Sequence, residues 1–290
     1  MLYLTYALNF LLMIALPLLL GAFLARRLGV TWSLFGIGAV TFIASQGVHL
    51  PLNAGLTALF ANHLLPSPPL AWKLPFNSIV LGLTAGLCEE IARYVVYRRW
   101  ITSARTWREA LMFGAGHGGI EAIIFGALAG LGYVNIVVLK NTDLSSYQLS
   151  PEQQALAAQQ IAAYWSAPWY ATLLGALERL FSLTFHLAMA VVMLQAINRK
   201  NLWWLALAIL LHATTDAVAV FAVSTWGLYW TEAIIGVFAL ISLGLIFGLK
   251  PAHEAIVPEP VTLLPSTAPS PAAEPEDELR DKLDESRFSS

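Results

Sequence analysis

The sequence predicts an all-α fold, a polytopic membrane helix bundle of about seven transmembrane helices, with the N-terminus outside and the C-terminus inside. Of the 290 residues, 58% are hydrophobic and 12% are charged, and the mean hydropathy is +0.66. In a soluble globular domain about 25% of the residues are charged. The apolar residues form runs of membrane-spanning length, and the basic residues gather between alternate runs. We therefore expect an integral membrane protein.

Seven apolar runs are long enough for a spanning helix, which needs roughly 17–25 residues. The first run has no basic segment before it and is followed by Arg26 and Arg27. We therefore expect it to be a retained helix and not a cleaved signal peptide. The runs lie near residues 3–25, 32–52, 76–97, 111–139, 168–197, 202–223 and 228–249.

The basic residues set the predicted orientation, because Lys and Arg accumulate in cytoplasmic loops. With the N-terminus outside, the outer loops hold only Lys73 and Lys140. The cytoplasmic segments then hold nine basic residues, which are Arg26, Arg27, Arg98, Arg99, Arg105, Arg108, Arg199, Lys200 and Lys250.

Two loops on the predicted outer side have distinct compositions. Residues 63–75 (HLLPSPPLAWKLP) are rich in proline. Within residues 140–167, Ser150 suits an N-cap, Pro151 suits the first helical position, and Gln153 completes a capping box. We therefore expect a short amphipathic helix that lies near the outer interface.

The last 40 residues differ from the rest of the chain. Residues 251–290 are rich in Pro, Ala, Ser and acidic residues and carry a net charge of −6, against +4 for residues 1–250. Such a composition cannot bury a core. We therefore predict a transmembrane domain, 1–250, and a disordered, acidic, Pro-rich cytoplasmic tail, 251–290. The single cysteine, Cys88, excludes an internal disulfide, and no basic patch indicates a nucleic-acid partner.

Titratable side chains lie inside the third to sixth predicted spans. One charge at the centre of a spanning helix costs about 2.5–3.5 kcal/mol on insertion scales, so such residues are functional by default. With a rise of about 1.5 Å per residue, these groups lie roughly 9–16 Å from the cytoplasmic ends of their helices. Four helices therefore bring such groups to similar depth. The residues are Glu89, Glu90, His117, Glu121, His186 and His212.

Helical spacing places several of these residues on shared faces. Residues four positions apart lie on one face of a helix, and lipid cannot satisfy their polar atoms, so the faces must point into a polar bundle interior. Helix two offers a further polar stripe, and the glycines of 113–132 allow close helix packing. The spaced pairs are Glu89 with Arg93, His117 with Glu121 and His212 with Asp216, and the stripe is Gln46, His49 and Asn53.

Three short motifs follow one another along the chain: EEIAR (89–93), FGAGH (113–117) and HATTD (212–216). They resemble the motifs of a superfamily of polytopic, glutamic-type intramembrane proteases that includes type II CAAX prenyl proteases, CPBP proteins and PrsW. The phrase GAGHGGIEAIIFG and the overall layout look most like the bacterial YhfC branch. The first motif is one residue shorter than the EExxxR of that superfamily, and the third ends in Asp216 where HxxxN is common.

The resemblance implies roles for the residues that match. Glu89 with His117 would position and deprotonate a water molecule. His212, helped by Asp216, would stabilise the oxyanion. These residues and Glu90 are the predicted catalytic set.

Three further polar residues are predicted to support this set. Arg93 is expected to be a structural partner of Glu89 or Glu90, because a buried cation needs an anion. Glu121 and His186 are additional polar groups to which the motifs of the superfamily assign no role.

Three alternatives stay open. The first is a zinc-dependent protease, although the soluble signature H-E-x-x-H is absent; we favour the metal-free glutamic mechanism, with no cofactor. The second is a proton-coupled transporter, which the lack of repeated halves argues against. The third is a non-catalytic membrane scaffold with an inert relic of the site. The candidate metal ligands are His117, Glu121, His186 and His212.

The resulting hypothesis is an intramembrane endopeptidase, with residues 1–250 as its protease-like domain. Its substrate would be a membrane-embedded or membrane-associated protein or peptide. Its other partner would be the lipid bilayer. We expect it in the cytoplasmic membrane of a bacterium.

Overall fold

The computed structural model describes residues 1–252 and consists there of eight α-helices and three short 3-10 turns. This confirms the all-α prediction. The predicted tail, 251–290, lies outside the described residues except for its first two positions. The α-helices are α1 (Leu2–Leu28), α2 (Trp32–Ala61), α3 (Lys73–Arg99), α4 (Trp107–Lys140), α5 (Pro151–Ser166), α6 (Leu174–Asn198), α7 (Trp203–Thr225) and α8 (Leu228–Gly248), and the turns are η1 (Leu70–Trp72), η2 (Leu144–Ser146) and η3 (Ala171–Leu173).

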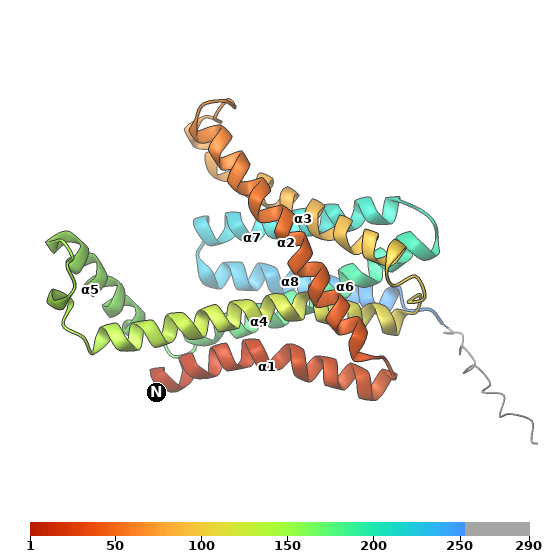
Figure 1. Ribbon diagram of the computed structural model, residues 1–290, viewed down its shortest axis with the longest axis horizontal. Helices are drawn as coiled ribbons and strands as arrows, with labels where there is room; N and C mark the ends of the chain where they lie inside the picture. The colour runs from red at the N-terminus through yellow and green to blue at the C-terminus, as the bar shows by residue number, and fades with distance from the viewer. Residues whose placement is uncertain (253–290) are drawn as a thin grey trace, which may run out of the picture. The chain divides into compact units, whose positions relative to one another are not determined.

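Six of the described helices are long and apolar enough to cross a membrane: α1, α2, α4, α6, α7 and α8. The protein is therefore an integral membrane protein. Helix α3 is less apolar, because it carries six Lys, Arg and Glu residues. It nevertheless packs along α7 and α2 (Figure 1), and we keep the prediction that it is the seventh span.

Helix α2 is longer than the sequence predicts. The expected span ended at residue 52, one position after Pro51, but the helix continues through this proline to Ala61. A proline inside a helix removes one backbone donor, and such breaks are tolerated in spanning helices where neighbouring groups compensate. The part of α2 after Pro51 therefore extends, with the first turns of α3, away from the rest of the bundle (Figure 1).

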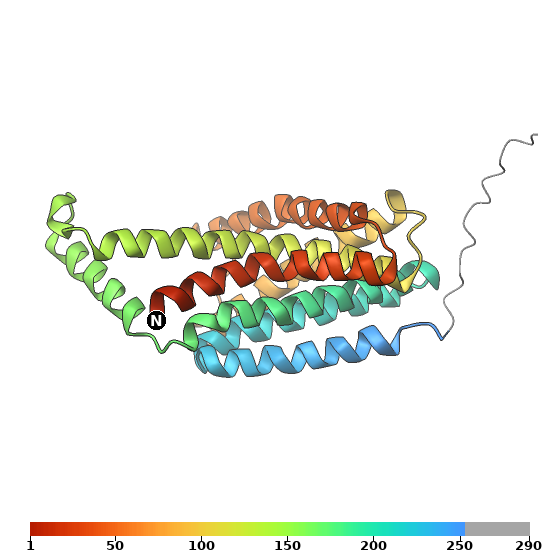
Figure 2. The same ribbon diagram turned by 90° about the horizontal axis from the view of Figure 1, so that it is seen from below.

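Helix α4 lies at the centre of the bundle and packs against α1, α2 and α6 (Figures 1 and 2). Its glycines let backbones meet directly. A Cβ atom at Gly116 would collide with the carbonyl oxygen of Phe35 in α2, and one at Gly38 with the carbonyl oxygen of Phe113. A Cβ at Gly118 would lie 2.6 Å from the His186 ring. These contacts confirm the expected close approach and make room for His186.

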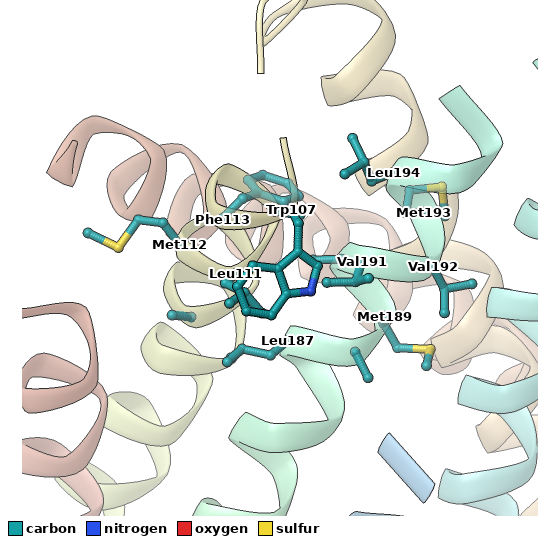
Figure 3. Packing of buried hydrophobic residues seen from close by; sticks show 14 of the residues in the cluster. Trp107, Leu111, Met112, Phe113, Leu187, Met189, Val191, Val192, Met193 and Leu194 are labelled. Carbon is teal, nitrogen blue, oxygen red and sulfur yellow. The ribbon is translucent and has the colours of Figure 1, made fainter. Parts of the chain in front are cut away.

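An apolar core joins the first turns of α4 to the second half of α6 (Figure 3). Phe113, Met189 and Val191 are almost fully buried in it, and the Trp107 indole Nε1 donates to the Ile246 carbonyl of α8 at 2.8 Å. Because lipid is as apolar as these side chains, van der Waals packing stabilises such an interface. The core thus fixes α4 against α6 directly beside their polar residues.

The amphipathic helix predicted after Ser150 is present as α5, and both hydrogen bonds of its Ser150–Gln153 capping box are formed. Aromatic residues join it to the start of α1. The Tyr6 hydroxyl donates to the Tyr164 carbonyl at 2.6 Å, and the two rings stack with centroids 4.0 Å apart. The loop therefore contacts the bundle through a defined interface.

Candidate active site

The structure brings the predicted catalytic helices together around one carboxylate. Glu89 from α3, His117 from α4, His186 from α6 and His212 from α7 are all buried and lie within one cluster. The His186 ring centroid lies 5.2 Å from that of His117 and 5.8 Å from that of His212. The expected convergence of polar groups at one depth is therefore found in three dimensions.

The two oxygens of Glu89 have different neighbours. Oε2 lies 3.0 Å from His117 Nε2 and 3.7 Å from His212 Nε2. Oε1 accepts a hydrogen bond from Gln46 Nε2 of α2 at 3.1 Å. One oxygen is thus held by an amide, and the other faces two imidazoles.

Glu90 is fully buried and holds two basic groups. It forms an ion pair with Arg93, as predicted, and its Oε1 lies 2.7 Å from His212 Nδ1. Because an ionised carboxylate only accepts, this contact places the His212 proton on Nδ1. Nε2 of His212 is then directed at Glu89 and at Asp216, whose Oδ2 is 3.5 Å away.

His186 is bound at both ring nitrogens. Arg93 Nη2 approaches Nδ1 at 2.6 Å, and Glu121 Oε2 lies 2.5 Å from Nε2. Since a guanidinium only donates, Nδ1 accepts and Nε2 carries the proton. Glu121 also accepts from Arg179 Nη1 at 2.6 Å, and Arg179 pairs with Glu178.

A cavity of about 120 Å³ opens beside the cluster, between α4, α6, α7 and α8. The side chain of Asp216 is 39% exposed there, so the cavity reaches a carboxylate as well as His212. Five predicted site residues line it, which are Glu89, Glu121, His186, His212 and Asp216. Glu178, Arg179 and three phenylalanines, Phe181, Phe185 and Phe238, also lie on its wall.

Sequence reasoning missed some features of this site. The phenylalanines of the wall stand among many apolar residues, so nothing in the sequence marks them. Glu232 of α8 belongs to no motif, yet it is buried, and its Oε2 has no hydrogen-bond partner among the described residues. Gln46 was expected only as part of the polar stripe of the second helix, whereas it binds Glu89 directly.

The donor atoms of the cluster fit a metal ion. Glu89, His117 and His186 each offer one ligand atom, and these atoms lie within 4.8 Å of one another. One carboxylate and two imidazoles form a common catalytic zinc set. His117 Nδ1 also lacks a hydrogen-bond partner here. The donor types and spacing fit, although His186 would exchange a bond to Arg93 or Glu121 for the ion.

Comparison with known proteins agrees with the motifs. A family model described as YhfC intramembrane metalloprotease matches residues 12–239, which include every candidate site residue. The uncharacterized membrane protein YhfC of Bacillus subtilis (strain 168) is 29% identical over 219 residues, spanning 71% of this chain and 79% of the relative. No solved structure matches. The family description favours the metal-dependent alternative over the metal-free mechanism that we preferred from the sequence.

Proposed function

The chain belongs to the YhfC intramembrane metalloprotease family, and from this premise we propose that it is a metal-dependent endopeptidase that cleaves membrane-embedded or membrane-associated proteins or peptides at the Glu89 cluster. The family implies a peptide hydrolase. The observation that carries the proposal is the buried cluster of Glu89, His117 and His186, whose ligand atoms lie within 4.8 Å of one another.

In this proposal Glu89, His117 and His186 hold the ion. Zinc suits one carboxylate and two imidazoles. When bound, such an ion polarises the scissile carbonyl and makes water a better nucleophile at neutral pH. The protein's part is to fix the donors: Gln46 holds Glu89 Oε1 at 3.1 Å, and Glu121 fixes His186 through Nε2. Outer partners of this kind orient ligands and tune the metal.

His212 and Asp216 act on the substrate from the cavity wall. Glu90 holds the proton of His212 on Nδ1, so Nε2 faces the reacting region. Asp216 stands 3.5 Å from this nitrogen at the exposed side of the cavity. In this tautomer Nε2 can accept a proton from the attacking water, and the imidazolium so formed can donate to the carbonyl oxyanion and pass the proton to the departing amine, while Asp216 stabilises its charge.

The cavity has a mixed wall. The carboxylates and imidazoles of the site lie beside three phenylalanines, Phe181, Phe185 and Phe238. Such a wall can receive the polar peptide group of a substrate next to an apolar side chain.

The proposal is tested with purified protein in lipid nanodiscs and a fluorogenic transmembrane peptide. The wild type should contain about one zinc ion per site, lose cleavage on prolonged dialysis against a strong chelator, and regain it with zinc. Glu89→Gln should lose both zinc and cleavage, whereas Thr57→Val, on the outer part of α2, should retain both. Cleavage that survives complete removal of metal would exclude the metal-dependent mechanism.

One observation favours the metal-free glutamic mechanism as a second candidate. Both nitrogens of His186 are already bound, and the Arg93 guanidinium reaches within 3.8 Å of Glu89 Oε2. In that mechanism Glu89 and His117 activate water themselves, and Arg93 supplies the nearby positive charge. The chelation experiment separates the two candidates, because only the metal-dependent enzyme loses activity with its ion.

A further inference from the structure

A chain of hydrogen-bonded polar side chains leads to Glu89 along α2. Apart from Gln46, its members have no role in the proposed metal site. Asn53 Nδ2 lies 2.8 Å from His49 Nε2, and His49 Nδ1 lies 3.1 Å from Gln46 Oε1. Gln46 Nε2 then donates to Glu89 Oε1 at 3.1 Å. At the far end, Thr84 Oγ1 donates to Asn53 Oδ1 at 3.0 Å.

The hydrogen bonds of this chain share one direction. The Asn53 amide nitrogen only donates, so His49 Nε2 accepts and the His49 proton sits on Nδ1. Nδ1 therefore donates to Gln46 Oε1, and the Gln46 NH₂ group is turned toward Glu89. Every partner fixes the orientation of the next, and the last donor is aimed at one oxygen of the carboxylate.

Helix association alone does not explain these residues. Thr84 of α3 contacts both Asn53 and His49, at 3.0 and 3.3 Å, so one end of the chain does join α2 to α3. The Gln46–His49 and His49–Asn53 hydrogen bonds, however, join residues three and four positions apart on the same helix. Helix α2 is already held by the backbone contacts at Gly38 and Gly116. All three side chains are only half-buried, and polar groups at such positions in a spanning helix are expensive.

We infer that Gln46 and His49 are positioning residues for Glu89, with Asn53 as the anchor of the chain. Gln46 holds Oε1 so that Oε2 faces His117 and His212, and His49 holds the Gln46 amide in the donating orientation. The inference rests on the proposed function only in that Glu89 is taken as the central carboxylate of the reaction. It assigns a role in the reaction to the polar stripe of α2.

The expected effects follow from the position of the chain behind the carboxylate. Losing an outer partner of a metal ligand typically lowers metal affinity or activity about 10–100-fold. Gln46→Leu and His49→Phe should each lower zinc affinity and kcat by about this factor, with a smaller change in KM. Because His49 acts through Gln46, the double variant should be no worse than Gln46→Leu alone.

A conservative variant separates positioning from bulk structure. In His49→Asn the amide nitrogen can take the place of Nδ1 and donate to Gln46, so affinity and kcat should recover most of the loss seen in His49→Phe. Thr57→Val serves as the matched control on α2, because its hydroxyl bonds only to the Asn53 carbonyl. Thermal unfolding of each variant shows whether it is folded.

The experiment measures zinc affinity by competition with a chelating dye, and kcat and KM on the transmembrane peptide, for the whole protein in nanodiscs. Wild-type zinc affinity and kcat in Gln46→Leu, or independent, additive losses in the double variant, would overturn the inference. If Gln46→Leu does not fold, His49→Phe and His49→Asn still decide it, and equal losses in these two would refute it. A Glu89→Gln variant with normal zinc and cleavage would instead refute the proposed function.

Discussion

The two adjacent carboxylates of α3 have different partners, and this difference predicts different results for their amides. Glu90 is fully buried between Arg93 and His212, whereas Glu89 faces the cavity. Glu90→Gln leaves the buried Arg93 charge beside a neutral group, and breaking one half of a buried ion pair costs about 3–5 kcal/mol. We expect lower yield and a lower Tm for Glu90→Gln, measured by thermal unfolding in nanodiscs.

A second variant shows whether the stranded charge is the cause. In Glu90→Gln with Arg93→Gln, the uncompensated cation is gone, so most of the lost thermal stability should return. Glu89→Gln should keep nearly normal stability in the metal-free protein and lose zinc binding and cleavage, because it removes one proposed ligand. Equal effects of Glu89→Gln and Glu90→Gln on both measurements would contradict this division of roles.

At this scale the sequence predicted which residues meet but not which atoms. Depth and spacing were enough to bring Glu89, His117 and His212 together, because charges in a spanning helix must share a polar interior. The Glu90–Arg93 pair followed from the need to neutralise a buried cation. The attachment of His186 to Arg93 depends on how α6 is rotated against α3, and a single sequence carries no signal for that rotation.

At the scale of the helices, glycines control the distance between α2 and α4. A methyl group at Gly116 would overlap the Phe35 carbonyl oxygen, whereas at Gly132 of the same helix a Cβ meets nothing within 4 Å. Gly116→Ala must push α2 away and should destabilise the fold by about 1–3 kcal/mol, the usual effect of overpacking. Gly132→Ala should change the Tm little. A Tm of Gly116→Ala equal to that of Gly132→Ala would show that this close contact is not formed.

The accuracy of the predicted helices has physical causes. The start of α5 was predicted closely because Ser150, Pro151 and Gln153 act locally, through a cap that needs no tertiary partner. The end of α2 was wrong because the effect of Pro51 depends on its surroundings: in water it would end the helix, but this helix continues for ten more residues. The glycines of 113–132 predicted close helix packing around α4 but not that α2 is the helix that meets it.

For the whole molecule, the predicted orientation decides which side of the membrane supplies substrate and water to the site. The count of basic residues predicts that the α3–α4 loop lies inside and that the α2–α3 and α4–α5 loops lie outside. The single native cysteine, Cys88, is half-buried within α3, so the wild type gives a low and measurable background for labelling. Introduced cysteines can therefore report on each loop separately.

A membrane-impermeant maleimide applied to intact cells should label cysteines introduced at Ser67 and Ser146 and should not label one at Ser103, in the α3–α4 loop. After the membrane is permeabilised, the Ser103 variant should label as strongly as the others, which shows that its thiol is accessible. The physical reason is the bias of nine basic residues on one side against two on the other. Labelling of Ser103 in intact cells with protection of Ser146 would invert the topology. The cluster of Glu89 and His117 would then lie nearer the outer surface, and substrates would have to be sought on that side.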